Sequence, residues 1–87
     1  MISFRLTHNA VLGYQRLLAP SNSMSGAYGE LKRACADGRY ECRAPTWLRR
    51  TRSDADGYVL LDGDLAALPV RRGRVIACLV NPLRAAR

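Results

Sequence analysis

The stretch that decides the fold is residues 57–80, which read GYVLLDGDLAALPVRRGRVIACLV. Two turn signals divide it, Asp62-Gly63 and Arg71-Arg72-Gly73, because glycine after a polar residue favours the tight turn of a β-hairpin. The apolar runs around these turns have the length of ordinary strands. They predict three consecutive antiparallel strands, over residues 57–61, 64–70 and 74–80.

Two features of these runs indicate how the strands are placed. Pro69 has no backbone N–H, so its strand belongs at an edge of the sheet or beside a bulge. Residues 74–80 are nearly all apolar, which favours the centre of the sheet. Upstream, residues 39–43 alternate in polarity and predict a fourth strand with Tyr40 and Cys42 on one side.

The N-terminal part of the chain predicts a strand and two helices. Residues 2–6 alternate in polarity, and Thr7 is placed to cap a helix that begins near His8. A second helix follows, which ends at Gly38 in a left-handed cap. The candidates for its N-cap are Ser21, Ser23 and Ser25.

This order of elements predicts an α+β fold of two layers. An N-terminal strand and two helices pack on an antiparallel sheet of about four strands. Because the chain has only 87 residues and shows no linker, we expect a single domain over residues 1–87. Residues 82–87 are expected to form a flexible basic tail.

The charge of the chain is high and segregated. There are 14 basic and 7 acidic side chains, which give a formal charge of +7. Residues 1–53 carry +6, residues 54–64 carry −4 and residues 65–87 carry +5. A field of this sign favours polyanions. All but one of the basic residues are arginines, which suit bidentate contacts with phosphate or carboxylate, although a GC-rich genome also favours arginine codons.

Several classes of protein are excluded by the patterns that the sequence lacks. No apolar run approaches the ~20 residues that a membrane span needs, and the first residues lack the layout of a signal peptide, so we expect a cytoplasmic protein without a membrane partner. The phosphate-loop, zinc-protease, nucleophile-elbow and dinucleotide-binding motifs are absent.

No metal or cofactor is expected. Cys35 and Cys78 lie among apolar positions and are interpreted as buried thiols, whereas the place of Cys42 is left open. Closely spaced carboxylates can bind hard cations, but here they flank a strand at opposite ends, which favours two solvated turns. These acids are Asp54, Asp56, Asp62 and Asp64.

Two groups of arginines are candidate nucleic-acid-binding residues. Such groups bind phosphates in a salt-sensitive manner, and a neighbouring tryptophan can stack on a base. The alternative is that the tryptophan closes the end of a small core and the arginines form a solvated rim. The candidates are Arg49, Arg50 and Arg52 in the long loop, Trp47 just before them, and Arg71, Arg72 and Arg74 at the second turn.

A catalytic site is a further hypothesis. His8 is the only histidine and the natural acid–base group at neutral pH, and its alternative role is in the helix cap. A histidine with an arginine and a tyrosine can cleave RNA, because one group takes the 2′-hydroxyl proton while arginine stabilises the charged phosphate. The candidate catalytic residues are His8, Arg72 and Tyr58.

Part of the sequence is similar to known small proteins. Residues 4–10, FRLTHNA, resemble the start of small uncharacterised proteins of actinobacteria and their phages, as do residues 44–48, APTWL, and residues 72–79, RGRVIACL. The order of elements resembles the RelE/ParE-like toxins, in which two helices precede an antiparallel sheet. The resemblance implies a basic sheet surface that binds RNA at the ribosome or, in other branches, inhibits gyrase. The RNases of that family use arginine, lysine and often a tyrosine near the C-terminus. Here residues 83–87 contain no tyrosine, and Lys32 is the only lysine of the chain.

These patterns support three functions. The first is a small basic protein that binds RNA, other nucleic acid or the ribosome, with a RelE-like endoribonuclease toxin as its enzymatic form. The second is a non-enzymatic phage or bacterial protein that binds an acidic host protein and inhibits or modulates it. The third is a structural subunit of a larger assembly.

Overall fold

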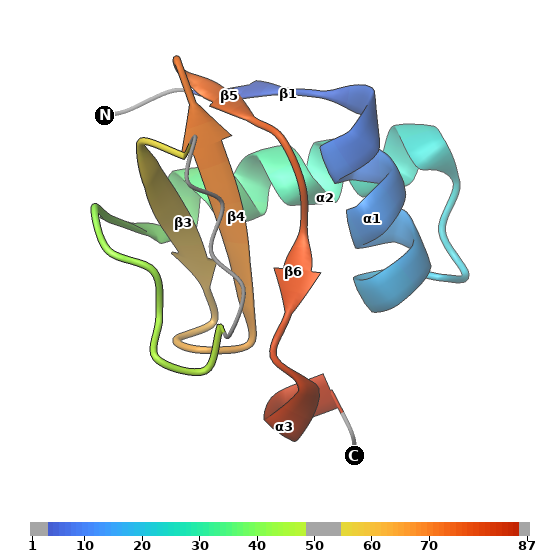
Figure 1. The fold of residues 1–87 in the computed structure, drawn as a ribbon. Coiled ribbons are helices and arrows are strands. Elements are labelled where there is room, and N and C mark those ends of the chain that lie inside the picture. Colours follow the sequence, from blue (N-terminus) through green and yellow to red (C-terminus); the bar gives the residue numbers. More distant parts are fainter. Residues whose placement is uncertain (1–3, 49–54, 86–87) are drawn as a thin grey trace.

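The structure, a computed structural model, describes residues 4–48 and 55–85. These residues form an α+β fold in which helices cover one face of a single sheet, so the predicted class is confirmed (Figure 1). The elements are, in order, β1 (Arg5–Leu6), α1 (His8–Leu18), α2 (Met24–Asp37), β2 (Arg39–Glu41), β3 (Gly57–Leu61), β4 (Ala66–Arg71), β5 (Arg74–Val75), β6 (Leu79–Val80) and α3 (Pro82–Ala85).

The sheet differs from the predicted one in strand number, direction and order. Within the described ranges it has six strands in the order β1-β5-β4-β3-β2, with β6 paired to β4 beyond the end of β5. All pairs are antiparallel except β1 with β5, which is parallel. The expectation of a wholly antiparallel sheet of about four strands is therefore wrong, because the N-terminal strand joins the sheet as a parallel partner.

Residues 74–80 do not form one central strand, as the sequence predicted. They form two short strands, and the central strand is β4. Val70 pairs with Val75 and Ala67 pairs with Leu79. Between these two pairs, residues 76–78 lie opposite only residues 68 and 69. The irregularity lies at Pro69, whose carbonyl accepts a hydrogen bond from the Ile76 N–H at 2.9 Å but which has no N–H to donate in return. The bulge expected beside Pro69 is thus present, whereas an edge position is not.

Both helix N-caps are made by hydroxyl side chains. Thr7 caps α1 as predicted, and its Oγ1 accepts a hydrogen bond from the Ala10 N–H at 3.3 Å. Of the three candidate serines, Ser23 caps α2. Gly38 ends α2 with φ −75° and ψ 167°, so the predicted left-handed cap is wrong. The reason for glycine there is space, because a Cβ atom would stand 2.8 Å from Cγ1 of Val59.

The sheet is buried on both faces. On one face it packs against α1 and α2 through residues that include Leu31, Val59 and Leu68. On the other face Tyr58, Leu60 and Ala67 form a second, smaller cluster, which is covered by Ala44, Trp47, Leu48 and Ala55. This double burial explains why every residue of β3 is buried.

The three cysteines have two kinds of environment. Cys35 and Cys78 are buried in the main core, as predicted, and Cys42 is exposed. Burial disfavours a thiolate, so it raises the pKa of Cys35 to about 11 and the pKa of Cys78 to about 12. These two thiols are packing groups rather than nucleophiles.

Candidate nucleic-acid interface

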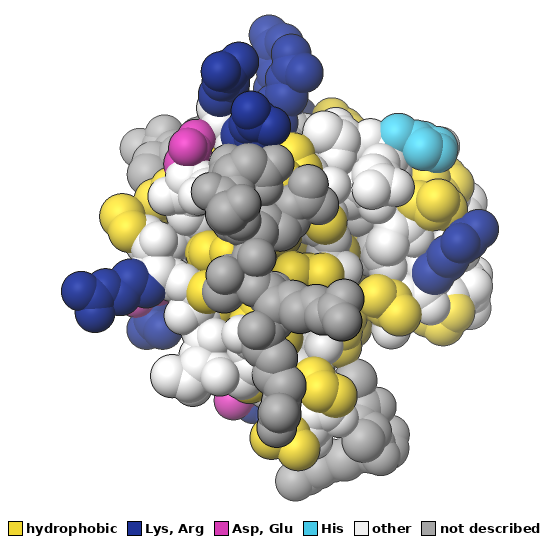
Figure 2. All heavy atoms as spheres, in the orientation of Figure 1, with side chains coloured by type: hydrophobic (Ala, Val, Ile, Leu, Met, Phe, Trp, Pro, Cys, Tyr) yellow, Lys and Arg dark blue, Asp and Glu magenta, His cyan; other side chains and the backbone are white. Residues whose placement is uncertain are grey.

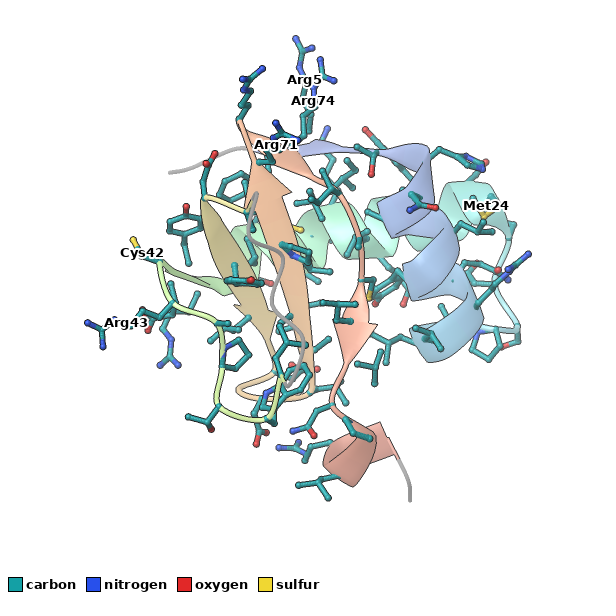
Figure 3. All side chains as sticks on the ribbon, viewed as in Figure 1. Arg5, Met24, Cys42, Arg43, Arg71 and Arg74 are labelled. Atoms are coloured by element: carbon teal, nitrogen blue, oxygen red, sulfur yellow. The ribbon has the colours of Figure 1, made fainter. Side chains whose placement is uncertain are left out.

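Three arginines from three adjacent strands stand in register at one end of the sheet. Arg74 of β5 pairs with Arg5 of β1 on one side and with Arg71 of β4 on the other. Side chains of residues paired in this way project from the same face of a sheet, about 5 Å from one strand to the next. All three side chains are exposed, and Figure 3 shows them at the same end of the sheet.

A fourth arginine, Arg72, extends this row into the β4–β5 turn. We call Arg5, Arg71, Arg72 and Arg74 the arginine cluster. In the space-filling view the dark blue side chains of this region gather at the end of the molecule where β1, β5 and β4 meet (Figure 2). The predicted arginines of the second turn are thus brought together, and Arg5 joins them.

The turn that carries Arg72 is tightly held. Arg72 and Gly73 have φ values of 51° and 76°, the two left-handed residues of a type I′ hairpin turn. A side chain makes the left-handed conformation unfavourable by about 1 kcal/mol or more. The Asp56 carboxylate accepts a hydrogen bond from the Arg72 backbone N–H at 2.7 Å. The Gly73 carbonyl accepts another from the Arg5 N–H at 2.9 Å, which ties β1 to the turn.

The arginine cluster borders a hollow of about 460 Å³, which we call the arginine hollow. The cluster has four arginines, and the Asp56 carboxylate bonds to the backbone N–H of one of them, Arg72. Guanidinium groups around a polar hollow are suited to bind phosphate oxygens, often in pairs. The residues that line it are Thr7, Arg71, Arg72, Arg74 and Ile76.

The other predicted site residues have separate surroundings. His8 is exposed at the start of α1 and lines a second hollow beside Leu6 and Tyr28. Tyr58 is only 4% exposed and packs in the small cluster with Leu60 and Ala67. The predicted catalytic set of His8, Arg72 and Tyr58 is therefore divided among two hollows and a core, and its catalytic role stays a prediction.

Trp47 has the packing position that the sequence left open. It lies against the small cluster on the face of the sheet opposite the helices. Its indole Nε1 atom is buried and has no hydrogen-bond partner among residues 4–48 and 55–85. The predicted neighbours Arg49, Arg50 and Arg52, like Asp54, lie outside the described residues, so their part in binding stays a prediction.

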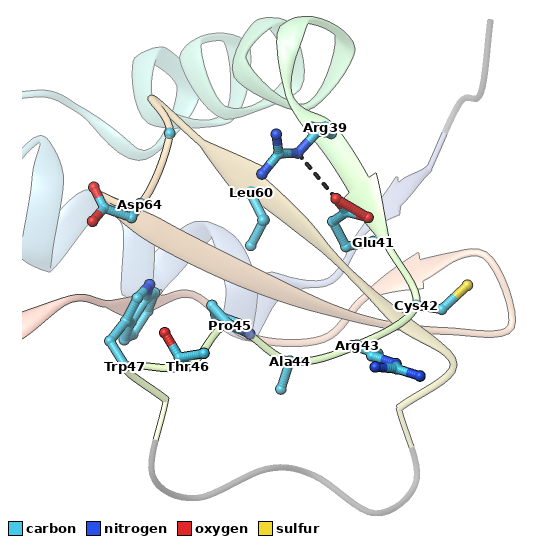
Figure 4. A pocket seen from close by; sticks show the side chains of 11 residues that line it. Arg39, Glu41, Cys42, Arg43, Ala44, Pro45, Thr46, Trp47, Leu60 and Asp64 are labelled. Carbon is cyan, nitrogen blue, oxygen red and sulfur yellow. Dashed lines mark ion pairs between the residues drawn. The ribbon is translucent and has the colours of Figure 1, made fainter.

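A larger hollow of about 770 Å³ lies between the segment that follows β2 and the β3–β4 turn (Figure 4). Its charges have both signs, and they are paired in part. Nε of Arg39 lies 3.2 Å from a carboxylate oxygen of Glu41, and Asp64 forms an ion pair with Arg84. This balance makes the hollow a weaker candidate for a polyanion than the arginine cluster.

The sequence did not identify Arg5 as a site residue. Its alternating strand did place Arg5 opposite Phe4 and Leu6, on the solvent side. No local pattern contains the parallel pairing of β1 with β5, which brings Arg5 beside Arg74 although 69 positions separate them in the sequence. The missing signal was long-range strand pairing.

Comparisons of the chain with protein-family models, with curated proteins and with solved structures found no match. In residues 4–48 and 55–85, no helix is long and apolar enough to cross a membrane. The arginine cluster is the described feature that combines concentrated charge, exposure and a rigid base.

Proposed function

We propose that this protein binds RNA through the arginine cluster, as a small basic protein directed to RNA or to the ribosome. The observation that supports it is the register of Arg5, Arg74 and Arg71, from which three arginine side chains project at one end of the sheet. Phosphates repeat along a nucleic-acid strand, so a row of cations from neighbouring strands can contact several of them together.

The rigidity of the cluster favours this function over a solvated rim. Two hydrogen bonds, from Arg72 to Asp56 and from Arg5 to Gly73, hold the backbone of the row in place. Arginines on a fixed backbone lose less freedom when they bind than arginines on a loose loop. The order of elements, which resembles that of the RelE/ParE-like toxins, also supports RNA as the ligand.

The test is the salt dependence of RNA binding. The affinity for a labelled RNA is measured by fluorescence anisotropy at several salt concentrations for the wild type, Arg5→Gln and Arg74→Gln. We expect each substitution to weaken binding several-fold and to reduce the slope of log K against log salt by about 1. Arg33→Gln is the matched control, because Arg33 is exposed on α2 and this variant has the same net charge as Arg5→Gln and Arg74→Gln.

Two results would contradict the proposal. One is a wild type that does not bind RNA in a salt-dependent manner. The other is a loss with Arg33→Gln equal to that with Arg5→Gln, since this would assign binding to net charge alone. An acidic host protein captured from lysate in stoichiometric amount, and unaffected by nuclease, would favour the partner-binding alternative.

RNA cleavage is a second candidate, which the position of His8 favours. His8 is exposed and lines the hollow beside Leu6 and Tyr28, while its neighbour in sequence, Thr7, lines the arginine hollow. An endoribonuclease would lose cleavage with His8→Ala while it retains salt-dependent binding. RNA that stays intact with the wild type would leave binding as the function.

A further inference from the structure

A second hollow, of about 450 Å³, lies where the beginnings of α1 and α2 meet the end of β1. Its exposed large hydrophobic side chains are Tyr28, at 44%, and Met24, at 36%. The rest of the lining is apolar apart from His8 and a serine. We call it the aromatic hollow, and it is lined by Leu6, His8, Val11, Met24, Ser25 and Tyr28.

The aromatic hollow is continuous with the arginine cluster along the chain. Thr7 lines the arginine hollow, while its neighbours Leu6 and His8 line the aromatic hollow. Three peptide steps separate Arg5 from His8, so their Cα atoms are at most about 11 Å apart. This distance is on the scale of one or two nucleotides of an extended strand.

The junction between the two hollows is fixed. Thr7 Oγ1 donates a hydrogen bond to the Val75 carbonyl at 2.7 Å and accepts one from the Ala10 N–H. The Thr7 backbone N–H also donates to the Val75 carbonyl at 3.1 Å. One residue thus holds β5, which carries Arg74, against the start of α1, which carries His8.

The charge around Tyr28 matches a polyanion rather than an apolar peptide. Nζ of Lys32 lies 5.9 Å from the centroid of the Tyr28 ring, one helical turn further along α2. Lys32 therefore lies beside the Tyr28 ring of the aromatic hollow, and the arginine hollow begins at Thr7, between Leu6 and His8. Proteins that bind single strands combine aromatic rings, on which bases stack, with cations that contact the phosphates.

We infer that the aromatic hollow receives an unpaired base of a single RNA strand whose phosphates lie on the arginine cluster. The base stacks on the Tyr28 ring beside His8, above the apolar side chains of Leu6 and Met24. Bases inside a duplex are stacked on one another and do not reach such a hollow, so the protein selects single strands. This inference rests on the proposed function, because the arginine cluster supplies the phosphate contacts.

The experiment compares three ligands by fluorescence anisotropy: a ten-nucleotide RNA, the same length of abasic backbone, and the corresponding duplex. For the wild type we expect the single strand to bind about 5- to 100-fold more tightly than the abasic strand. Tyr28→Ala should remove that difference and Tyr28→Phe should keep it, since phenylalanine retains the ring. Leu17→Ala is the matched control, because Leu17 is an exposed apolar residue of α1 that lines neither hollow.

The outcomes separate this inference from the proposed function. Equal affinity of the wild type for the single strand, the abasic strand and the duplex, with binding still lost in Arg74→Gln, would overturn the aromatic hollow alone. No salt-dependent binding of any ligand would overturn both. A loss with Leu17→Ala as large as that with Tyr28→Ala would also overturn the inference, and circular dichroism checks that each variant is folded.

Discussion

The Asp56 carboxylate bonds to the backbone N–H of Arg72, 16 residues later in the sequence, at 2.7 Å. The backbone N–H of Asp56 in turn donates to the Val70 carbonyl at 2.7 Å, so this one acid joins the start of β3 to the end of β4. An acidic residue therefore supports the shape of the most basic surface that the structure describes.

Substitution of Asp56 separates its structural role from its charge. Asp56→Ala removes the bond to Arg72 and should lower the free energy of unfolding by about 1–2 kcal/mol, as measured by urea denaturation. Asp37→Ala is the control, since Asp37 is an exposed acid at the C-terminal end of α2, where removal of a negative charge is neutral or stabilising. Equal stability of Asp56→Ala and wild type would show that the turn does not depend on this bond.

A substitution at Arg72 should change stability and RNA binding in opposite directions. It has a left-handed backbone, which asparagine adopts more readily than arginine, and Asn-Gly is the preferred pair in a type I′ turn. We expect Arg72→Asn to raise the free energy of unfolding by up to about 1 kcal/mol and to weaken RNA binding. Arg39→Asn, on β2 away from the cluster, should leave binding unchanged. A more stable variant with undiminished affinity would remove Arg72 from the proposed interface.

Local chemistry made part of this fold predictable from the sequence. The turns at Asp62-Gly63 and Arg72-Gly73, the cap at Thr7 and the bulge beside Pro69 each follow from the preferences of one or two residues. The arginines of the second turn could be grouped for the same reason. Their neighbours in sequence are also their neighbours in space, because a hairpin turn keeps them together.

The rest depends on contacts between distant segments. The pairing of β1 with β5 decides that Arg5 joins the cluster, and no local pattern contains it. The apolar run of residues 74–80 predicted a central strand, but it divides because Pro69 on the partner strand lacks an N–H. The aromatic hollow was missed because Tyr28 and Leu6 meet only after α1 and α2 have packed.

The buried thiols predict how stability changes in alkali. Burial raises the pKa of Cys35 to about 11 and of Cys78 to about 12, from an ordinary value of 9.0. Above pH 9 the unfolded chain loses these protons while the folded protein keeps them. The contribution of the two thiols to the free energy of unfolding is therefore fully present below about pH 9 and should be lost as the pH rises towards 12. Urea midpoints between pH 8 and pH 10 measure this dependence.

The control for the thiols is the third cysteine. Cys42 is exposed, so Cys42→Ser should retain the pH dependence, whereas Cys78→Ala should reduce its slope. In the native protein, iodoacetamide at pH 8 should modify Cys42 first. A native protein whose three thiols react at the same rate would contradict the burial of Cys35 and Cys78.

Thr7 provides the last test, because its hydroxyl joins the sheet to α1 at the junction of the two hollows. Thr7→Val keeps the shape but removes the hydrogen bonds to the Val75 carbonyl and the Ala10 N–H, and should lower the free energy of unfolding by about 1–2 kcal/mol. Thr7→Ser keeps the hydroxyl and should recover most of that loss. Thr46→Val, at an exposed position, is the matched control. If Thr7→Ser were as unstable as Thr7→Val, the hydroxyl would not be sufficient to hold this junction, and the methyl group would be needed as well.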